Sequence, residues 1–383
     1  MTEDGIHALL SPQALPENAR KLRDFYACKP GAPVLMREFG FYSLERWIGE
    51  GHISRQADLN ALCGFDEDAR AHLGHLGWCE AEFFPAFEEK VIEDRGAYEV
   101  VQDFAGRHVL YFKDRRQGFM PEYLECPVKD WKTWEEDVKW RLDPAAPGRL
   151  EAMKSSIDAA VAKARMGYWV QQHVIGGYMY LRSLIGPEQL MYMFYDEPEL
   201  LHNCMQTWLA LSDRVIAEYQ KHVSLDELFL AEDICYNHGC LISPDTMREF
   251  LLPYYQQLIQ NIKSRQLDKR RTLHIQIDTD GDCRPVIPIY QEMGMDIMSP
   301  FEVASGCDVV DIGRQYPRLA MLGGMDKRVL ATTTDEIDRM VDRIMPVMKQ
   351  RGGFIPTCDH GVPEEVSFGN YIHFRKRLLE YSS

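Results

Sequence analysis

Three aspartates lie within five residues at the end of an apolar segment, and their spacing is the strongest chemical signal in this chain. The segment covers residues 274–277, and Asp278, Asp280 and Asp282 follow it. Three carboxylates this close together cannot all be buried as charges unless a cation, an arginine or water receives them. Asp278 and Asp280 are therefore candidates to bind a metal or a substrate, whereas we expect Asp282 to cap the following helix.

A second short apolar segment, residues 353–357, also ends in polar groups. Cys358, Asp359 and His360 follow it directly, and Gly361 permits a tight bend there. In (β/α)8 barrels the active site lies at the carboxyl ends of the strands, so groups in these positions meet. His360 is a predicted ligand or proton donor beside the aspartates, and a hydrogen bond to a loop carbonyl is its alternative role. We expect Cys358 to be a core residue.

Two glutamates follow other predicted strands and extend this candidate site. Glu232 comes after the strand predicted at 227–231 and precedes an irregular stretch that should lie over the barrel mouth. It is a candidate catalytic group together with Asp280 and His360, and capping or loop fixing is the competing role. Glu302 follows the strand predicted at 296–299. It is a candidate metal ligand beside Asp278, Asp280 and His360, or a partner that orients the histidine.

Aromatic and polar side chains near two further strand ends are candidate substrate contacts. They lie in the last residues of the strands predicted at 33–39 and 168–175 or shortly after the first of them. Core packing at helical spacing is the alternative role of the rings. The candidate substrate-binding residues are Arg37, Phe39, Phe41, Tyr42, Gln172 and His173.

The pattern of elements indicates what positions these groups. Strands alternate with helices without a GxGxxG turn, which favours a closed α/β barrel over a doubly wound sheet. We therefore predict one domain, residues 1–383, folded as a (β/α)8 TIM barrel with an N-terminal arm at 1–30. A β-hairpin insertion is expected at about 80–130, around the turn Ala105-Gly106-Arg107. The other predicted strands are 272–277, 320–322 and 354–357, and the predicted helices are 131–165, 187–195, 197–222 and 244–266.

Composition limits the classes of partner and compartment. The 383 residues carry a formal charge of −16, which argues against nucleic acid or an anionic membrane as the main partner. Ten scattered cysteines without a CxxC pair are typical of reduced thiols. The first residues lack the pattern of a signal peptide, and no apolar run approaches a membrane span. We expect a cytoplasmic protein, and a homodimer is one assembly that the sequence permits.

Several motifs, spread over most of the chain, resemble the uroporphyrinogen decarboxylase superfamily, whose members are (β/α)8 barrels. The matching segments are MREFGFYSLERWIGEG at 36–51, ISPDTMREFLLPYYQQLI at 242–259, DTDGD at 278–282, LGGMDKRVLA at 322–331 and GGFIPTCDHGVPEEVSFGNY at 352–371. The decarboxylases themselves carry an arginine-rich RQAGRY segment that grips the carboxylates of the tetrapyrrole. Residues 37–42 of this chain read REFGFY, with one arginine, and are poorly suited to a polyanionic porphyrinogen.

The resemblance extends to the corrinoid-dependent methyltransferases of this superfamily, which often bind zinc through a His-x-Cys pair and a distant cysteine. Alignment of that motif places Asp278 on the histidine, Asp280 on the first cysteine and His360 on the distal cysteine. The resemblance therefore implies zinc or another divalent metal on harder ligands. Thiolates suit a zinc that activates a thiol, whereas carboxylates and an imidazole suit an oxygen-bearing substrate.

We therefore expect a methyltransferase that moves the methyl group of a methoxylated, aromatic compound to the cobalt of a separate corrinoid protein. The chain contains no Asp-x-His-x-x-Gly segment of a cobalamin-binding unit, so the cobalamin is expected on a partner protein. Two alternatives stay open at this point. One is a uroporphyrinogen decarboxylase-like decarboxylase of a smaller acid, and the other is a binding barrel without catalytic activity.

Overall fold

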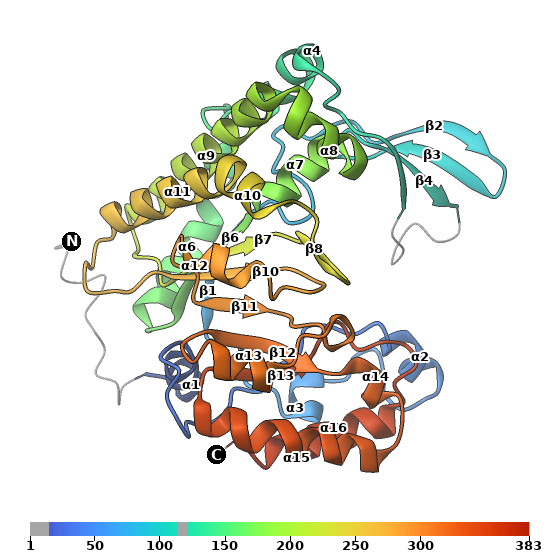
Figure 1. Ribbon diagram of the computed structural model, residues 1–383, viewed down its shortest axis with the longest axis vertical. Helices are drawn as coiled ribbons and strands as arrows, with labels where there is room; N and C mark the ends of the chain where they lie inside the picture. The colour runs from blue at the N-terminus through green and yellow to red at the C-terminus, as the bar shows by residue number, and fades with distance from the viewer. Residues whose placement is uncertain (1–14, 114–120, 383) are drawn as a thin grey trace.

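The computed structural model describes residues 15–113 and 121–382. A seven-stranded parallel sheet, in the order β1-β6-β7-β10-β11-β12-β13, forms its centre (Figure 1). Its strands are β1 (Arg70–Leu76), β6 (Trp169–Ile175), β7 (Glu227–Ala231), β10 (His274–Asp278), β11 (Ile297–Ser299), β12 (Ala320–Met325) and β13 (Phe354–Cys358). Helices surround the sheet, so the fold is α/β and TIM-barrel-like, which confirms the predicted fold class.

The helices that follow the central strands cover the outside of the sheet. Helices α9 and α11 lie against each other at one end of the molecule, and α15 and α16 pair at the other end (Figure 1). Their bounds are α6 (Lys154–Arg165), α7 (Gly177–Ile185), α8 (Pro187–Asp196), α9 (Pro198–Gln220), α10 (Pro244–Phe250), α11 (Leu252–Arg265), α12 (Ile287–Gln291), α13 (Val309–Gln315), α14 (Lys327–Leu330), α15 (Thr334–Arg351) and α16 (Phe368–Leu379).

Two predicted helices are interrupted in the structure. The helix expected at 244–266 is split into α10 and α11 just before Pro253, because proline lacks the amide hydrogen that would continue the helix. The helix expected at 131–165 is a series of short turns, α4 (Trp131–Thr133), a π-helical turn at 134–138, a 3₁₀ turn at 139–142 and α5 (Arg149–Ala152), before α6 begins. Prolines and a glycine between residues 143 and 149 break its middle.

The predicted insertion is a four-stranded antiparallel sheet, larger than a single hairpin. Its strands are β2 (Lys90–Arg95), β3 (Tyr98–Gln102), β4 (His108–Phe112) and β5 (Glu122–Glu125). Strands β3 and β4 pair around the predicted turn at 105–107, and Asp103 closes that turn by accepting hydrogen bonds from the Ala105 and Arg107 amides. The sheet projects from the body of the molecule in Figure 1. A second small ribbon consists of β8 (Cys235–Tyr236) and β9 (Gly239–Cys240).

The first predicted strand, residues 33–39, forms no ladder in the structure, and this prediction was wrong. Side chains take up its hydrogen bonds: Asp66 accepts from the Met36 amide at 2.7 Å, and Glu38 accepts from the Cys358 amide at 2.9 Å. The strand missed by the sequence is β1, in which His72 and His75 contact His173 of β6 and make the apolar alternation weak. Helices α2 (Leu44–Gly49) and α3 (Leu59–Cys63) connect the two segments.

Part of the N-terminal arm closes the floor of the barrel. Residues 1–14 of the predicted arm lie outside the described residues, and α1 (Glu17–Tyr26) begins soon after them. Leu22 and Tyr26 of α1 are buried in a cluster with Trp169, Ile297 and Ile355 of the central strands. The helix therefore covers the amino ends of the strands and leaves the carboxyl ends open for a site.

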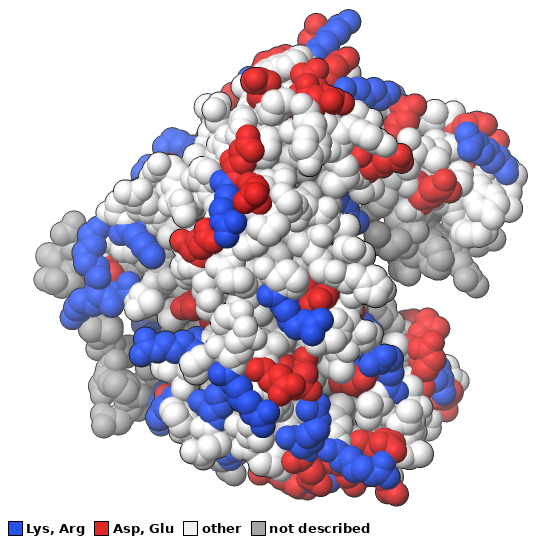
Figure 2. Space-filling model, viewed as in Figure 1, with Lys and Arg blue, Asp and Glu red and all other residues white. Residues whose placement is uncertain are grey.

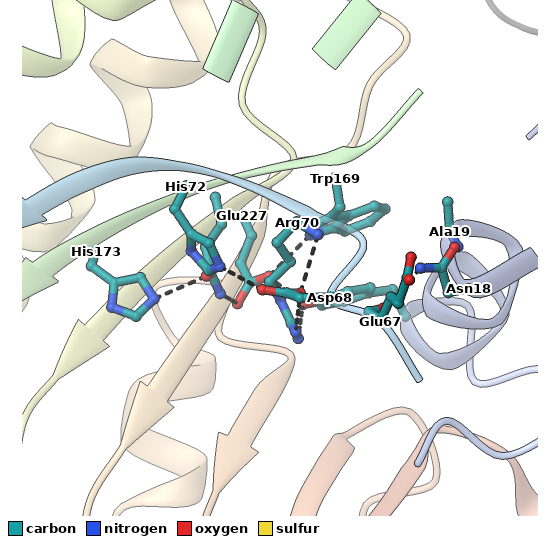
Figure 3. Close-up of polar contacts among 11 residues, drawn as sticks. Asn18, Ala19, Glu67, Asp68, Arg70, His72, Trp169, His173 and Glu227 are labelled. Atoms are coloured by element: carbon teal, nitrogen blue, oxygen red, sulfur yellow. Dashed lines mark hydrogen bonds and ion pairs between the residues drawn. The ribbon is translucent and has the colours of Figure 1, made fainter. Parts of the chain in front are cut away.

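A buried polar network lies directly above this floor (Figure 3). The carboxylate of Glu227 is fully buried, and it accepts hydrogen bonds from Gln171 Nε2 at 2.6 Å, Trp169 Nε1 at 3.0 Å and the Tyr26 hydroxyl. Arg70 is 3% exposed, and its Nε lies 3.8 Å from Glu227 Oε2. Burying a carboxylate is costly, so the Arg70 guanidinium is the group that compensates its charge.

Replacing Arg70 by methionine should lower the free energy of unfolding by about 3–5 kcal/mol, because the Glu227 carboxylate would stay buried without its cation. Urea denaturation followed by circular dichroism measures this change. Arg95→Met, which removes an exposed arginine from the insertion, is the matched control and should change stability little. Adding Glu227→Gln to Arg70→Met should recover part of the loss. A double variant no more stable than Arg70→Met would contradict this account.

The surface carries both signs of charge despite the net charge of −16. On the face shown in Figure 2, basic side chains are interspersed with acidic ones over most of the lower half. Within the described residues, no helix combines the length and the apolar composition that crossing a bilayer requires. All ten cysteines are present as free thiols.

Candidate active site

One cavity of roughly 710 Å³ lies at the carboxyl ends of the central strands, where the sequence analysis placed the site. Residues from strand ends, from the segment after residue 38 and from the insertion line it together. The predicted residues in its wall are Phe39, Phe41, Tyr42, Glu232, Asp278, Asp280 and His360. Residues more than 300 positions apart in the chain therefore share one cavity.

Asp278 is the last residue of β10 and reaches the cavity floor. The parallel register pairs it with Ser299 at the end of β11, and the Ser299 hydroxyl donates a hydrogen bond to Asp278 Oδ2. Its position deep in the barrel raises the pKa of Asp278 to about 7, with the neighbouring Asp280 and Asp233 as smaller causes. Near neutral pH this carboxyl group therefore carries a proton part of the time and can donate it.

Glu232 follows β7 directly and is fully buried. Its oxygens accept hydrogen bonds from the Tyr255 hydroxyl at 2.6 Å and from the Tyr178 amide at 3.0 Å. Burial raises the pKa of Glu232 to about 7 in spite of these donors. A glycine is required at position 176, because a Cβ there would lie 1.9 Å from Glu232 Oε2. The glutamate is thus a second carboxyl group that carries a proton part of the time near neutral pH, held in one orientation.

His360 and Asp280 form an ion pair in the wall of the cavity. Nε2 of His360 lies 3.5 Å from Asp280 Oδ2, and this contact raises the pKa of His360 above its usual value. The ring of Tyr42 stacks on the imidazole with centroids 5.8 Å apart. The pair is only partly covered, with the His360 side chain 35% exposed and the Asp280 side chain 43% exposed. An imidazolium in this position can stabilise negative charge that develops on a bound ligand.

Backbone pairing brings the aromatic wall next to His360. The Val362 amide donates to Gly40 O at 2.9 Å, and the Tyr42 amide donates to Val362 O at 2.9 Å. Glu38 anchors the same segment, because it also accepts a hydrogen bond from the Tyr371 hydroxyl at 2.9 Å. No role for Glu38 was predicted from the sequence. These contacts replace the missing strand ladder and fix the rings at the mouth of the cavity.

If the methoxyarene expected from the sequence binds in this cavity, removing an aromatic ring from the wall should weaken its binding. Phe39 is 41% exposed and Tyr42 is 58% exposed, so both rings have surface to cover a ligand. We expect Phe39→Ala and Tyr42→Ala each to cost about 1–3 kcal/mol of binding free energy, the range for lost aromatic contact. Isothermal titration calorimetry measures it, and Phe112→Ala, an exposed ring on β4, is the control. Unchanged affinity in both cavity variants would place the ligand elsewhere.

The predicted metal ligands do not converge on a common point. Asp278 accepts a hydrogen bond from Ser299, and His360 is paired with Asp280 at 3.5 Å. Glu302 lies outside the cavity wall, where it accepts from Lys327 Nζ at 2.7 Å and from the Gly281 amide at 2.9 Å. Within residues 15–113 and 121–382, no three His, Cys, Asp or Glu side chains are arranged to hold a metal ion. These donors as arranged do not fit zinc, which stays a prediction of the sequence.

Glu302 has a structural role in this arrangement. Its hydrogen bond holds Gly281, whose φ of +79° belongs to the left-handed region that glycine adopts readily. A Cβ at this position would lie 2.7 Å from the backbone of Tyr236. Glu302 therefore fixes the turn that presents Asp280, and it makes no hydrogen bond to His360.

Three predicted substrate contacts lie away from the cavity wall. Arg37 lines a separate cavity of roughly 270 Å³ beside Asp66. Gln172 is fully buried, and its amide nitrogen donates to Gly74 O at 3.1 Å and to His173 O at 2.8 Å. His173 packs on Phe229 inside the barrel, with centroids 4.2 Å apart, and burial lowers the pKa of His173 to about 3. Adjacent side chains of a strand point to opposite faces, so Gln172 and His173 of β6 cannot both contact the same substrate.

Several residues of the wall carry no strand-end signal and were missed. Arg182 comes from α7, and Trp78 comes from the segment after β1. Only Asp233 was signalled in part, because it follows Glu232 after β7. The wall residues outside the prediction are Gly40, Trp78, Cys79, Arg107, Tyr123, Cys126, Met179, Arg182, Ser183, Pro187, Ala231, Asp233, Pro300 and Gly361. Arg107, Tyr123 and Cys126 come from the insertion or its end, which therefore forms one side of the cavity.

Known proteins resemble this chain in sequence and in structure. Residues 121–381 match the family model described as uroporphyrinogen decarboxylase (URO-D). The uroporphyrinogen decarboxylase of Hydrogenovibrio crunogenus is 26% identical over 200 residues, which cover 50% of this chain and 51% of that protein. The one from Shewanella pealeana is 28% identical over 202 residues, covering 49% and 51%. The chain thus spans about half the length of the curated relatives it matches.

A solved structure extends the similarity over nearly the whole chain. A methyltransferase from Methanosarcina mazei superposes with a TM-score of 0.59 over 96% of this chain and 99% of that chain. The two sequences are 14% identical. At this identity the superposition establishes a shared fold.

Proposed function

The chain belongs to the uroporphyrinogen decarboxylase family, and on that premise we propose that it is a methyltransferase acting on a small methoxylated aromatic compound. The acceptor in this proposal is the cobalt of a corrinoid carried by a separate protein. One observation supports it above the others: the cavity joins an aromatic wall to two carboxyl groups whose pKa values are raised to about 7. That combination suits an uncharged arene whose ether oxygen must accept a proton.

Aryl ether cleavage needs an acid because a phenolate is a poor leaving group. A proton donated to the ether oxygen as the C–O bond breaks lets the arene leave as a phenol. Bound to its own protein, the cobalt(I) of the corrinoid supplies the nucleophile for the methyl carbon. The residues of this chain then bind the arene, orient its methoxy group and hold the proton.

Asp278 is the residue to which we assign the proton. It combines a raised pKa with a place on the cavity wall, and Ser299 holds one of its oxygens. Glu232 is bonded through both of its oxygens, which suits a positioning role beside the acid. The imidazolium of His360 is available to stabilise the oxygen of the leaving group. Asp278, predicted from the sequence as a metal ligand, is thus the general acid in this proposal, and proton donation by Asp278 does not require zinc.

A decarboxylase of a small acid is the second candidate, because the relatives are named uroporphyrinogen decarboxylases. A carboxylated substrate needs a cation, yet Arg182 and Arg107 of the wall are each paired with a carboxylate. Product analysis separates the candidates. Incubation with a methoxyarene and a reduced corrinoid protein should release a phenol, whereas carbon dioxide from a carboxylated substrate would favour the decarboxylase.

A further inference from the structure

Each cationic side chain in the described wall of the cavity already has an acidic partner. Nη2 of Arg107 lies 2.6 Å from Glu80 and 2.7 Å from Asp103, and its side chain is 8% exposed. His360 is paired with Asp280 as described above. The third cation is Arg182, and Asp233 is its partner. An anionic ligand entering this cavity therefore finds no unpaired cation.

The Arg182 pair differs from the Arg107 pair in how it is held. Nη1 of Arg182 lies 2.7 Å from Asp233 Oδ2, and its other described contact is Met179 Sδ at 3.9 Å. A single carboxylate oxygen of Asp233 thus masks a guanidinium that can form bidentate hydrogen bonds with a carboxylate. Both members of the pair line the cavity, where the Arg182 side chain is 23% exposed and the Asp233 side chain is 39% exposed.

The backbone places Asp233 over the arginine at a conformational cost. Its φ is +42°, in the left-handed region that non-glycine residues rarely adopt. The Asp233 amide donates to Asp278 O at 3.2 Å, which ties this strained residue to the end of β10. A helix-capping or loop-closing aspartate would not need to direct its carboxylate at a cavity-lining arginine. The geometry points to a role for this carboxylate in what the cavity binds.

We propose that Asp233 masks Arg182 and thereby makes the cavity reject anionic ligands, so that the methoxylated substrate carries no carboxylate. This inference rests on the proposed function for the identity of the substrate, whereas the charge selection is a property of the cavity itself. An entering carboxylate must compete with Asp233 for Arg182, and displacing Asp233 would leave that aspartate unpaired beside the like charge of Asp280. A neutral arene leaves the pairings of Arg107, Arg182 and His360 intact.

A variant that unmasks the arginine tests the proposal. Asp233→Asn keeps the size of the side chain, and asparagine tolerates a positive φ as well as aspartate does. Calorimetric titration of the full chain with 4-methoxybenzoate and its neutral analogue 4-methoxybenzamide gives the readout. The affinity for the benzoate should rise about ten-fold or more, the size expected for one charge-assisted hydrogen bond, while the affinity for the amide stays the same.

Two further variants distinguish charge masking from a structural brace. Arg182→Gln added to Asp233→Asn should abolish the gain for the benzoate, because the unmasked cation is gone. Asp282→Asn is the matched control, since Asp282 bonds Arg284 in a neighbouring loop outside the cavity wall and should leave both affinities unchanged. If the Arg182–Asp233 pair had only a structural role, Asp233→Asn would instead lower the melting temperature and weaken the binding of both ligands alike.

Different experimental results overturn the charge selection and the proposed function. No gain in benzoate affinity in Asp233→Asn, or a parent protein that binds the benzoate as tightly as the amide, overturns the charge selection. A gain for the benzoate supports it even if the amide binds weakly. An amide that binds well and is never demethylated in the presence of corrinoid protein overturns the proposed function alone.

Discussion

Replacing Asp278 by asparagine should lower the turnover of methoxyarene demethylation by about 10²–10⁴-fold, the contribution of a general acid. Asparagine keeps the shape of the side chain and removes the proton that the ether oxygen needs. Stopped-flow or steady-state measurement of phenol release, with saturating corrinoid protein, gives the rate. Asp282→Asn, the same change in the same loop but outside the cavity wall, should leave the rate unchanged.

The pH profile identifies which acid is used. Because burial raises the pKa of Asp278 to about 7, its protonated form is lost as the pH rises through 7, and the rate of the parent enzyme should fall there. Asp278→Asn should lack this fall. Glu232→Gln should retain it, although the pKa of Glu232 is also raised to about 7. A fall that persists in Asp278→Asn and disappears in Glu232→Gln would transfer the acid role to Glu232.

The same raised pKa affects stability with a definite sign. A carboxyl whose pKa is higher in the folded protein than in the unfolded chain stabilises the fold below the unfolded pKa of about 4. That contribution is lost as the pH rises through the folded value of about 7. Asp278→Asn should therefore flatten the decline of stability between these pH values, measured by urea denaturation.

A turnover rate that depends on a metal ion would contradict the assignment of Asp278 as the general acid. If a chelator abolishes the turnover of the parent enzyme and added zinc restores it, the predicted metal site forms in spite of the arrangement described above. Elemental analysis of the purified protein and of Asp280→Ala would then show whether that metal depends on Asp280. Turnover that is insensitive to chelator, with the pH profile expected above, supports Asp278 as the acid.

Demethylation should depend completely on a corrinoid protein supplied in trans. An unactivated aryl methyl ether needs a stronger nucleophile than any side chain of the cavity offers. Mixed with the methoxyarene alone, the enzyme should bind it without turnover. Addition of the reduced corrinoid protein should release one phenol for each corrinoid that becomes methylated, and the oxidised corrinoid protein is the control.

Salt should weaken this reaction through the docking step. The formal charge of −16 favours a partner with basic residues at the contact, and such attraction is screened within about 8–10 Å at physiological ionic strength. The apparent affinity for the corrinoid protein should therefore fall with salt, while the rate at saturation changes little. Steady phenol release without any corrinoid would refute methyl transfer.

The sequence by itself located the carboxyl ends of most central strands. Parallel strands bring their carboxyl ends to one edge, so polar residues directly after apolar segments are adjacent in space. This rule correctly brought Asp278, Glu232 and His360 to one cavity across more than 120 residues of chain. The segment after residue 38 also lies there, although isolated backbone hydrogen bonds to Val362 and the Glu38 side chain, and not a strand ladder, hold it.

Only the tertiary structure decided which other groups meet these residues and what charge they carry. Arg182 lies in a helix and Trp78 in a segment after an unrecognised strand, so neither shows a local pattern that marks the cavity. Strand β1 was not recognised because its histidines interrupt the expected apolar alternation. Proton affinity depends on burial and on neighbours from distant segments, which spacing along the chain does not encode. The sequence therefore determined which acidic side chains reach the site, and packing determined that the pKa values of Asp278 and Glu232 are raised there and that Asp233 is paired with Arg182.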